Sequence, residues 1–376
     1  MRTDPRPAPP TRGSASPPRL WFADNLRILL TSLVVLHHIA VMYSGLPLWY
    51  YVEPPTGAAA GAVLAIFVVV NQAWFMGAFF LLSGYFTPGS FDRKGPGAFL
   101  RDRLVRLGIP LVVFYFVLSP LLHAGSFPGG SPLETYLDTI GTGPLWFVLA
   151  LLVFDVCYAA FRVAVARRAP RERAARPPAF PMVLAFVAVL ALATYALRIV
   201  LPSGTWVPGI DFPSSAYLPQ YAAFFVAGAV AYRRGWFLTV TPRMGWAGFG
   251  LAAGASLVFL PLALAGGLEA WMGHGTLSSL FFALWDSAFA VGAVIALLAF
   301  FRRRLDGQGP LGRYLSAHAF TVYVIHAFVV TAAGLALGAL AWPTPAKFAL
   351  VAAVALPACF ALAGPIRRLP GVRRVL

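Results

Sequence analysis

The chain has 376 residues, 59% of them hydrophobic and only 11% charged, and its mean hydropathy is +0.76. Soluble domains are typically about 45–50% apolar and about 25% charged, so this chain could not cover a core of its size with polar surface. The composition therefore disfavours a water-soluble enzyme, a disordered chain and a nucleic-acid-binding protein. Cys157 and Cys359 lie in apolar runs, which excludes a disulfide scaffold or a cysteine zinc cluster, and we predict no bound metal. An integral membrane protein remains.

The net charge of +16 does not indicate nucleic-acid binding, because apolar runs separate the basic residues and no single basic patch forms. Each run has about 17–25 residues, enough to cross roughly 30 Å of hydrocarbon, and none shows the alternation of a barrel strand. We therefore predict an all-α, polytopic integral membrane bundle of about ten transmembrane helices. The runs are 21–44, 60–87, 105–122, 144–164, 180–201, 216–232, 244–265, 277–301, 317–338 and 346–364.

We expect a single membrane domain, residues 21–366, with a short segment on either side. Residues 1–20 are rich in Pro, Arg and Ser and are predicted to form a disordered cytoplasmic tail. Residues 367–376 are predicted to form a basic cytoplasmic tail. The segment 167–178, RRAPRERAARPP, is predicted to be a basic cytoplasmic loop that helps to set the topology.

The placement of lysine and arginine predicts the orientation in the membrane. With a cytoplasmic N-terminus, 27 of the 29 Lys and Arg residues lie on the cytoplasmic side, and only Arg198 and Lys347 lie on the other. The predicted outer loops carry carboxylates instead, such as Glu53 and Glu134. Both termini are therefore predicted to be cytoplasmic.

The first run, WFADNLRILLTSLVVLHHIAVMY, carries ionisable residues that are costly within a membrane unless they are paired or hydrated. At about 100° per residue, Arg27 and His38 share a helix face, about 16 Å apart along the axis. Asp24 lies near the same stripe and is expected to pair with Arg27 at i,i+3. An imidazole with an ordinary pKa near 6.5 suits general-base catalysis. The alternative is that Arg27 reaches the interface and the histidines only bond to neighbouring helices; His37, about 100° away, is expected to be structural.

Two motifs lie at the predicted cytoplasmic membrane edge. In Ser83-Gly84-Tyr85, the glycine would let a neighbouring backbone or a ligand approach closely. Arg103 and Arg106, three residues apart, would project from one side of a helix and could hold phosphates. Flanking arginines are, however, more often topology signals.

Other polar residues within the predicted spans are also candidates. Asp155 and Asp286 are expected to need a cationic partner, and Asp286 lies at a depth similar to that of His38. His326 is open to a structural or a functional role. The remaining candidates are Asn71, Trp146, Trp285 and Tyr323.

Several motifs, taken in order, resemble the acyltransferase 3 family, the polytopic membrane acyltransferases, over about residues 20–365. They are DNLRILLTSLVVLHH, FFLLSGYFTP, FLRDRLVRLGIP, GPLWFVLALL, LWDS and FTVYVIH. The phrase SGYFTPGSFDRKG is similar to the branch that contains the glucan biosynthesis protein C type of succinyltransferase.

The resemblance implies a multi-pass enzyme of the bacterial cytoplasmic (inner) membrane that uses acyl-CoA as a co-substrate, with no permanently bound cofactor. The acceptor would be a hydroxyl of a saccharide or other small molecule; membrane lipid surrounds the protein, and a homo-oligomer is left open. His38 is the expected catalytic residue, assisted by Arg27 and Asp24. Arg103 and Arg106 would serve the CoA end, and we add Ser83 and Tyr85 as candidates for binding the cofactor there. The candidates for substrate binding are Asn71, Trp285, Asp286, Tyr323 and His326; many relatives have glutamate where this chain has Asp286.

Two questions stay open at this point. A transporter or flippase for a polar or saccharide substrate is the competing function, although no pair of Gly/Pro-interrupted short helices is evident. Direct transfer with His38 as base competes with a covalent acyl-imidazole. The donor for the oxyanion is unidentified, with Trp285, Asn71 or Tyr323 as the options.

Overall fold

The computed structural model describes residues 19–124, 131–165, 175–207, 212–213 and 215–376. Residues 1–18 of the predicted N-terminal tail and residues 167–174 of the predicted basic loop lie outside these ranges.

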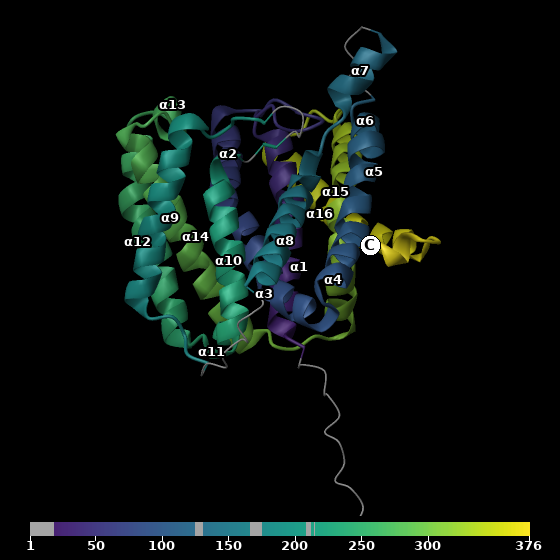
Figure 1. Ribbon diagram of the computed structural model, residues 1–376. Helices are drawn as coiled ribbons and strands as arrows, with labels where there is room; N and C mark the ends of the chain where they lie inside the picture. The colour runs from purple at the N-terminus through teal and green to yellow at the C-terminus, as the bar shows by residue number, and fades with distance from the viewer. Residues whose placement is uncertain (1–18, 125–130, 166–174, 208–211, 214) are drawn as a thin grey trace, which may run out of the picture.

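The described chain is an all-α bundle (Figure 1), and in these ranges the only β pairing is an isolated bridge between Val207 and Phe212. The longer helices are α1 (Trp21–Tyr43), α2 (Ala58–Gln72), α3 (Phe75–Lys94), α8 (Trp146–Ala164), α9 (Phe180–Val200), α10 (Leu218–Arg234), α12 (Pro242–Leu264), α14 (Leu277–Arg304), α15 (Pro310–Leu337) and α16 (Thr344–Arg368). Short helices are α7 (Pro132–Thr139), α11 (Trp236–Thr239) and α13 (Leu268–Met272), with 3₁₀ turns η3 (Gly143–Leu145), η4 (Ser215–Tyr217) and η5 (Val372–Arg374).

The predicted polytopic helical bundle is confirmed. Nine helical segments of the described chain are long and apolar enough to cross a membrane. A tenth, α10, has 17 residues and lies in the sixth predicted run. α1 is enclosed by α2, α3, α14, α15 and α16, so it forms the centre around which the other elements pack.

The second predicted run, 60–87, is interrupted near its middle. The chain leaves the helix at Ala73 and Trp74 and resumes at Phe75, where α3 begins. Irregular backbone at membrane depth needs protein partners because lipid offers none. Gln220 of α10 supplies one, since its side-chain amide donates to the Ala73 carbonyl at 2.8 Å. The neighbouring Gln72 amide donates to the Tyr221 hydroxyl at 3.1 Å.

The third predicted run is one continuous helical segment that contains two π turns. It consists of α4 (Pro96–Arg103), the π turn η1 (Leu104–Gly108), α5 (Ile109–Val113), the π turn η2 (Phe114–Leu118) and α6 (Ser119–Leu122). Each π turn ends two residues before a proline, Pro110 or Pro120. Proline has no N–H to donate and its ring crowds the preceding turn, so a wider turn at each site relieves the clash.

α3 and α10 approach so closely that glycines are required at the contact. A Cβ on Gly84 would lie 2.1 Å from the Phe225 carbonyl oxygen, and one on Gly228 would lie 2.1 Å from the Leu81 carbonyl oxygen. The close approach expected at Gly84 is therefore an approach of helix backbone, as is common where membrane helices cross.

Most of the described arginines gather at one end of the bundle, which we call the arginine-rich end. Arg162 and Arg233 there share the Asp92 carboxylate at 3.2 and 2.6 Å. The two basic residues predicted to lie on the other side are both neutralised by carboxylates. Arg198 pairs with Asp286 at 2.6 Å, and Lys347 pairs with Glu53 at 2.5 Å.

Replacing Gly84 with alanine is expected to destabilise the fold by about 1–3 kcal/mol, because the added methyl group forces α3 and α10 apart. The matched control is Gly254→Ala on α12, where a Cβ meets nothing within 4 Å. Denaturation of the purified variants in mixed micelles measures both. Equal stability of the two variants would contradict the proposed close contact.

Candidate functional site

The structure places His38 against two rings, Trp49 and His326, whose own centroids lie 6.1 Å apart. The His38 imidazole stacks on Trp49 with ring centroids 4.1 Å apart and on His326 with centroids 5.0 Å apart. His38 lies on α1, Trp49 follows α1 in the chain, and His326 lies on α15. Three separate segments therefore fix the orientation of the His38 ring.

A chain of hydrogen bonds determines which nitrogen of His38 carries its proton. The His326 Nδ1 lies 2.6 Å from the Tyr323 carbonyl oxygen, and since a carbonyl only accepts, Nδ1 is protonated. In a neutral His326 the Nε2 is then an acceptor, and it lies 3.1 Å from the His38 Nδ1. His38 accordingly donates through Nδ1 and keeps a lone pair on Nε2. No hydrogen bond from a described residue occupies this Nε2.

His37 makes different contacts from those of His38. The Asn71 amide donates to the His37 Nδ1 at 3.3 Å, and the His37 ring stacks on Phe75 with centroids 5.1 Å apart. His37 is 7% exposed. It therefore fills the space beside the α2–α3 break and holds Asn71 there.

The three residues considered as oxyanion donors all donate to protein atoms. The Trp285 indole N–H donates to the Ser256 hydroxyl at 3.1 Å, and the Tyr323 hydroxyl donates to the Pro144 carbonyl. Asn71 donates to His37. Each of these donors thus already satisfies an acceptor inside the protein.

Trp49 is a candidate that the sequence analysis missed. Its indole Nε1 is buried and has no hydrogen-bond partner among the described residues, while its ring lies against His38. A buried unpaired donor is costly, so a native protein retains few of them. The sequence signal was the aromatic stretch Trp49-Tyr50-Tyr51 just beyond the first span.

Asp286 lies in a fully buried ion pair. Arg198 and Asp286 are 0% and 1% exposed, and the guanidinium also stacks over the rings of Tyr217 and Phe282 at 4.8 and 5.0 Å. The expectation that a cation accompanies this carboxylate is confirmed. Asp155 is likewise paired, with Arg103 at 3.1 Å.

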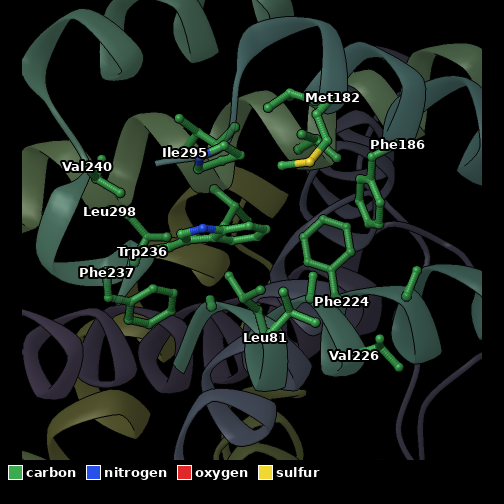
Figure 2. Close-up of a pocket in the computed structure, with 18 of the residues that line it drawn as sticks. Leu81, Met182, Phe186, Phe224, Val226, Trp236, Phe237, Val240, Ile295 and Leu298 are labelled. Carbon is green, nitrogen blue, oxygen red and sulfur yellow. The ribbon is translucent and has the colours of Figure 1, made fainter. Parts of the chain in front are cut away.

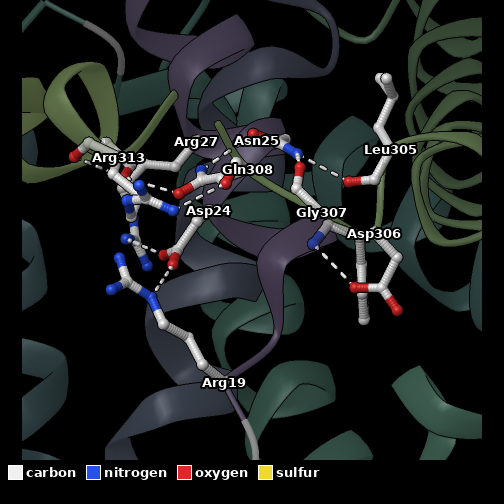
Figure 3. A network of polar contacts seen from close by, with 11 residues as sticks. Arg19, Asp24, Asn25, Arg27, Leu305, Asp306, Gly307, Gln308 and Arg313 are labelled. Carbon is white, nitrogen blue, oxygen red and sulfur yellow. Dashed lines mark hydrogen bonds and ion pairs between the residues drawn. The ribbon is translucent and has the colours of Figure 1, made fainter. Parts of the chain in front are cut away.

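Arg27 and Asp24 form the predicted i,i+3 ion pair at 2.9 Å, and Arg19 approaches the other Asp24 oxygen at 2.8 Å (Figure 3). Beside them, the Asn25 amide donates to the carbonyls of Leu305 and Gly307 at 2.6 and 3.0 Å. These contacts attach the start of α1 to the α14–α15 connection. Arg27 remains one-third exposed, with its side chain 33% accessible.

The two arginines expected to share one helix side have different surroundings. Arg103 points into the bundle, where it pairs with the fully buried Asp155, and Thr87 donates to the same carboxylate at 2.9 Å. The Arg106 side chain is 63% exposed and pairs with Asp102 at 3.2 Å. The π turn η1 begins between the two arginines, so residues three apart no longer align as on an α-helix.

Ser83 and Tyr85 lie in α3 beside the α10 contact. The Ser83 carbonyl oxygen lies 2.9 Å from the Thr87 hydroxyl and shares its single proton with the Asp155 carboxylate. The Tyr85 ring is buried and stacks on Phe237 with centroids 3.9 Å apart. Tyr85 is therefore part of the packing at the arginine-rich end.

The opposite end carries a polar cluster next to α1. The Tyr51 hydroxyl donates to Glu53 at 3.2 Å, and Glu53 in turn pairs with Lys347. Burial raises the pKa of the Tyr51 phenol, and the adjacent Glu53 carboxylate raises it further. Tyr51 thus stays a protonated donor at neutral pH.

The sequence was also compared with known families and proteins. The model of a family described as an acyltransferase domain matches residues 20–364. The chain belongs to this family. The molecule is therefore a membrane acyltransferase, an enzyme that transfers acyl groups. No curated protein matches its sequence.

Replacing Arg103 in the acyltransferase with alanine is expected to destabilise it by about 3–5 kcal/mol, because Asp155 would be left buried without its cation. The double variant Arg103→Ala/Asp155→Ala should recover most of this loss. The unfolding free energies of the four members of this cycle measure the coupling. The control, Arg106→Ala, removes an exposed pair and should cost at most about 1 kcal/mol. Additive effects of the Arg103 and Asp155 changes would refute the ion pair.

Proposed function

We propose that the enzyme transfers an acyl group, such as acetyl or succinyl, from acyl-CoA to a hydroxyl of a saccharide or small-molecule acceptor, with His38 as general base. One observation carries this proposal: the His38–His326–Tyr323 hydrogen-bond chain leaves the His38 Nε2 unprotonated and unoccupied by described residues. A base held in one tautomer is what activation of a hydroxyl requires.

The step then balances as follows. The acceptor hydroxyl gives its proton to the His38 Nε2 while its oxygen bonds to the thioester carbonyl carbon. Collapse of the tetrahedral intermediate breaks the carbon–sulfur bond, and the CoA thiolate takes the proton from the imidazolium. The products are an ester and free CoA, and His38 returns to its starting state.

Trp49 is our candidate for the oxyanion donor. Its indole N–H is buried and has no acceptor among the described residues, and its ring lies against the base. A donor placed where charge develops lowers the barrier most when it already lies in position and is shielded from water. Trp49 replaces the earlier candidates for this role, Trp285, Asn71 and Tyr323, because each of them donates to a protein group.

The arginine-rich end suits the donor's phosphates, and the positive-inside rule assigns that end to the cytoplasm. Arg106 is the more accessible arginine of its pair, and Arg27 is partly exposed at the start of α1. Arg27 lies about 16 Å along the helix from His38, so the extended pantetheine arm would connect phosphates at this end to a thioester at the base. We place Ser83 near this path. Asp155 holds the Arg103 guanidinium in position beside it.

We assign the enzyme to the bacterial cytoplasmic membrane, with both termini inside. The acceptor is best sought among envelope saccharides, since the SGYFTPGSFDRKG segment resembles the glucan-modifying branch. His326 and Tyr323 orient the base, and Asn71 supports the break beside it. Asp286, in its ion pair with Arg198, holds α14 against α9.

The His38→Ala variant is expected to release thiol from short acyl-CoAs, with an acceptor present, about 10²–10⁴-fold more slowly than the wild type. His326→Leu should lower kcat with little change in KM, because His38 would lose its acceptor. His326→Gln, whose side-chain carbonyl can accept from His38, should restore much of the activity.

The matched control for this series is His318→Gln, two turns earlier on the same helix, where the ring bonds only to the Tyr314 carbonyl in the described structure. Undiminished thiol release by His38→Ala would remove the base from the mechanism. Label retained on His38 after incubation with labelled acyl-CoA alone would make this histidine a nucleophile and overturn the direct route.

The Trp49→Phe variant keeps an aromatic ring against His38 but removes the N–H. We expect kcat to fall by about 10²-fold with KM nearly unchanged, because the donor acts on charge that exists only in the transition state. Steady-state kinetics with short acyl-CoAs measure kcat and KM separately. A rise in KM at constant kcat would instead indicate a ground-state binding role for Trp49.

A further inference from the structure

A cavity lies away from His38, between α9, α10, α12 and α14. It has a volume of about 530 Å³, within the range of small-molecule sites. Figure 2 shows that its walls are apolar side chains, with the Trp236 ring in the middle and Phe237 below it. Lining residues include Leu81, Met182, Phe186, Phe224, Ile295 and Leu298.

The cavity opens to the outside of the bundle. Met182 on α9 and Val226 on α10 both line it and are 47% and 59% exposed. Between Ala222 and Ala231 its wall follows α10 for about 14 Å along the axis. It therefore has the shape of an elongated apolar slot with a lateral entrance, which suits a hydrocarbon chain and not a polar ligand.

Two guanidinium groups lie at the end of this slot that faces the arginine-rich end. The Arg302 Nη1 donates to the carbonyl of Val240, a lining residue, at 2.6 Å. Arg243 borders an adjoining hollow of about 260 Å³, which shares Pro178, Val183, Met244 and Ile295 with the slot. Arg243 is exposed and forms no ion pair with a described residue. A carbon-lined slot thus ends at a cationic rim.

We propose that this slot binds one acyl chain of an anionic membrane phospholipid, whose phosphate lies against Arg243 and Arg302. Apolar walls accommodate the chain and a cationic rim selects for negative headgroups, which is the charge complementarity that anionic lipids find in basic pockets between helices. The proposal concerns a site separate from the acyl-transfer centre and does not depend on the chemistry assigned to His38.

The position of the slot gives the lipid a structural role. Phe237, on the short helix α11, lines the slot and also contacts Tyr85 of α3 and Phe22 of α1, with ring centroids 3.9 and 6.4 Å away. A chain in the slot would therefore support α11 from the lipid side, while α1 and α3 support it from the protein side. An occupied slot fills space that would otherwise lack packing partners.

The test uses the purified full-length protein in nanodiscs doped with photoreactive lipids. Phosphatidylglycerol and phosphatidylcholine, each with a diazirine in one acyl chain, serve as the two probes, and labelled residues are mapped by mass spectrometry. We expect the phosphatidylglycerol probe to label Met182, Phe186 and Trp236 more strongly than Leu257, a residue of α12 that is 78% exposed. Phosphatidylcholine should label the slot more weakly.

Two pairs of variants test the contributions of the cationic rim and of the apolar slot separately. Arg243→Gln, at an exposed position, should lower slot labelling by phosphatidylglycerol about fivefold, while Arg373→Gln should leave it unchanged. Ala227→Trp should fill the slot and abolish labelling there, and Leu257→Trp should not. Labelling of the slot equal to that of Leu257, or the same for both headgroups, would overturn the proposal. So would protection of the slot by a second copy of the chain, seen as labelling that appears only when dimers dissociate.

Discussion

A polar group in the apolar interior of this bundle has to find its partner inside the protein, and this requirement shapes most of the structure. The buried guanidinium of Arg198 bonds to Asp286, and the buried carboxylate of Asp155 bonds to Arg103. The backbone carbonyl of Ala73, at the break between α2 and α3, accepts a hydrogen bond from Gln220. Such pairs are weak evidence of net stability, because desolvation offsets much of their attraction, but breaking one is costly. They therefore fix which helices lie side by side.

Against this background, the groups without partners stand out. The His38 Nε2 carries no hydrogen bond from a described residue, and the buried indole N–H of Trp49, whose ring stacks on His38, has no acceptor in the same part of the chain. An acceptor and a donor left vacant in adjacent rings are complementary to a reacting hydroxyl and a developing oxyanion. Family membership shows that the chain transfers acyl groups, and these two atoms are where we propose that it does so.

The fold was largely predictable because membrane insertion leaves a direct record in the sequence. Run lengths predicted the helices, and the i,i+3 spacing predicted the Arg27–Asp24 pair, since both depend only on local geometry. Contacts between distant segments were not predictable. The bond between His38 and His326 joins residues 288 positions apart, and it depends on how α1 packs against α15. The prediction that Arg103 and Arg106 project from one side of the helix was wrong for a local reason, because a π turn begins between them.

The interrupted span α2–α3 has a consequence for biogenesis. Gln220, which satisfies the Ala73 carbonyl, comes 147 residues later in the chain. While the ribosome is still making the intervening segments, the kinked α2–α3 span would present an unpaired peptide carbonyl to lipid or to the translocon. The kink is completed only when α10 inserts, and its glycine contact with α3 forms at the same moment. The final packing of this early span therefore depends on a helix that is synthesised much later.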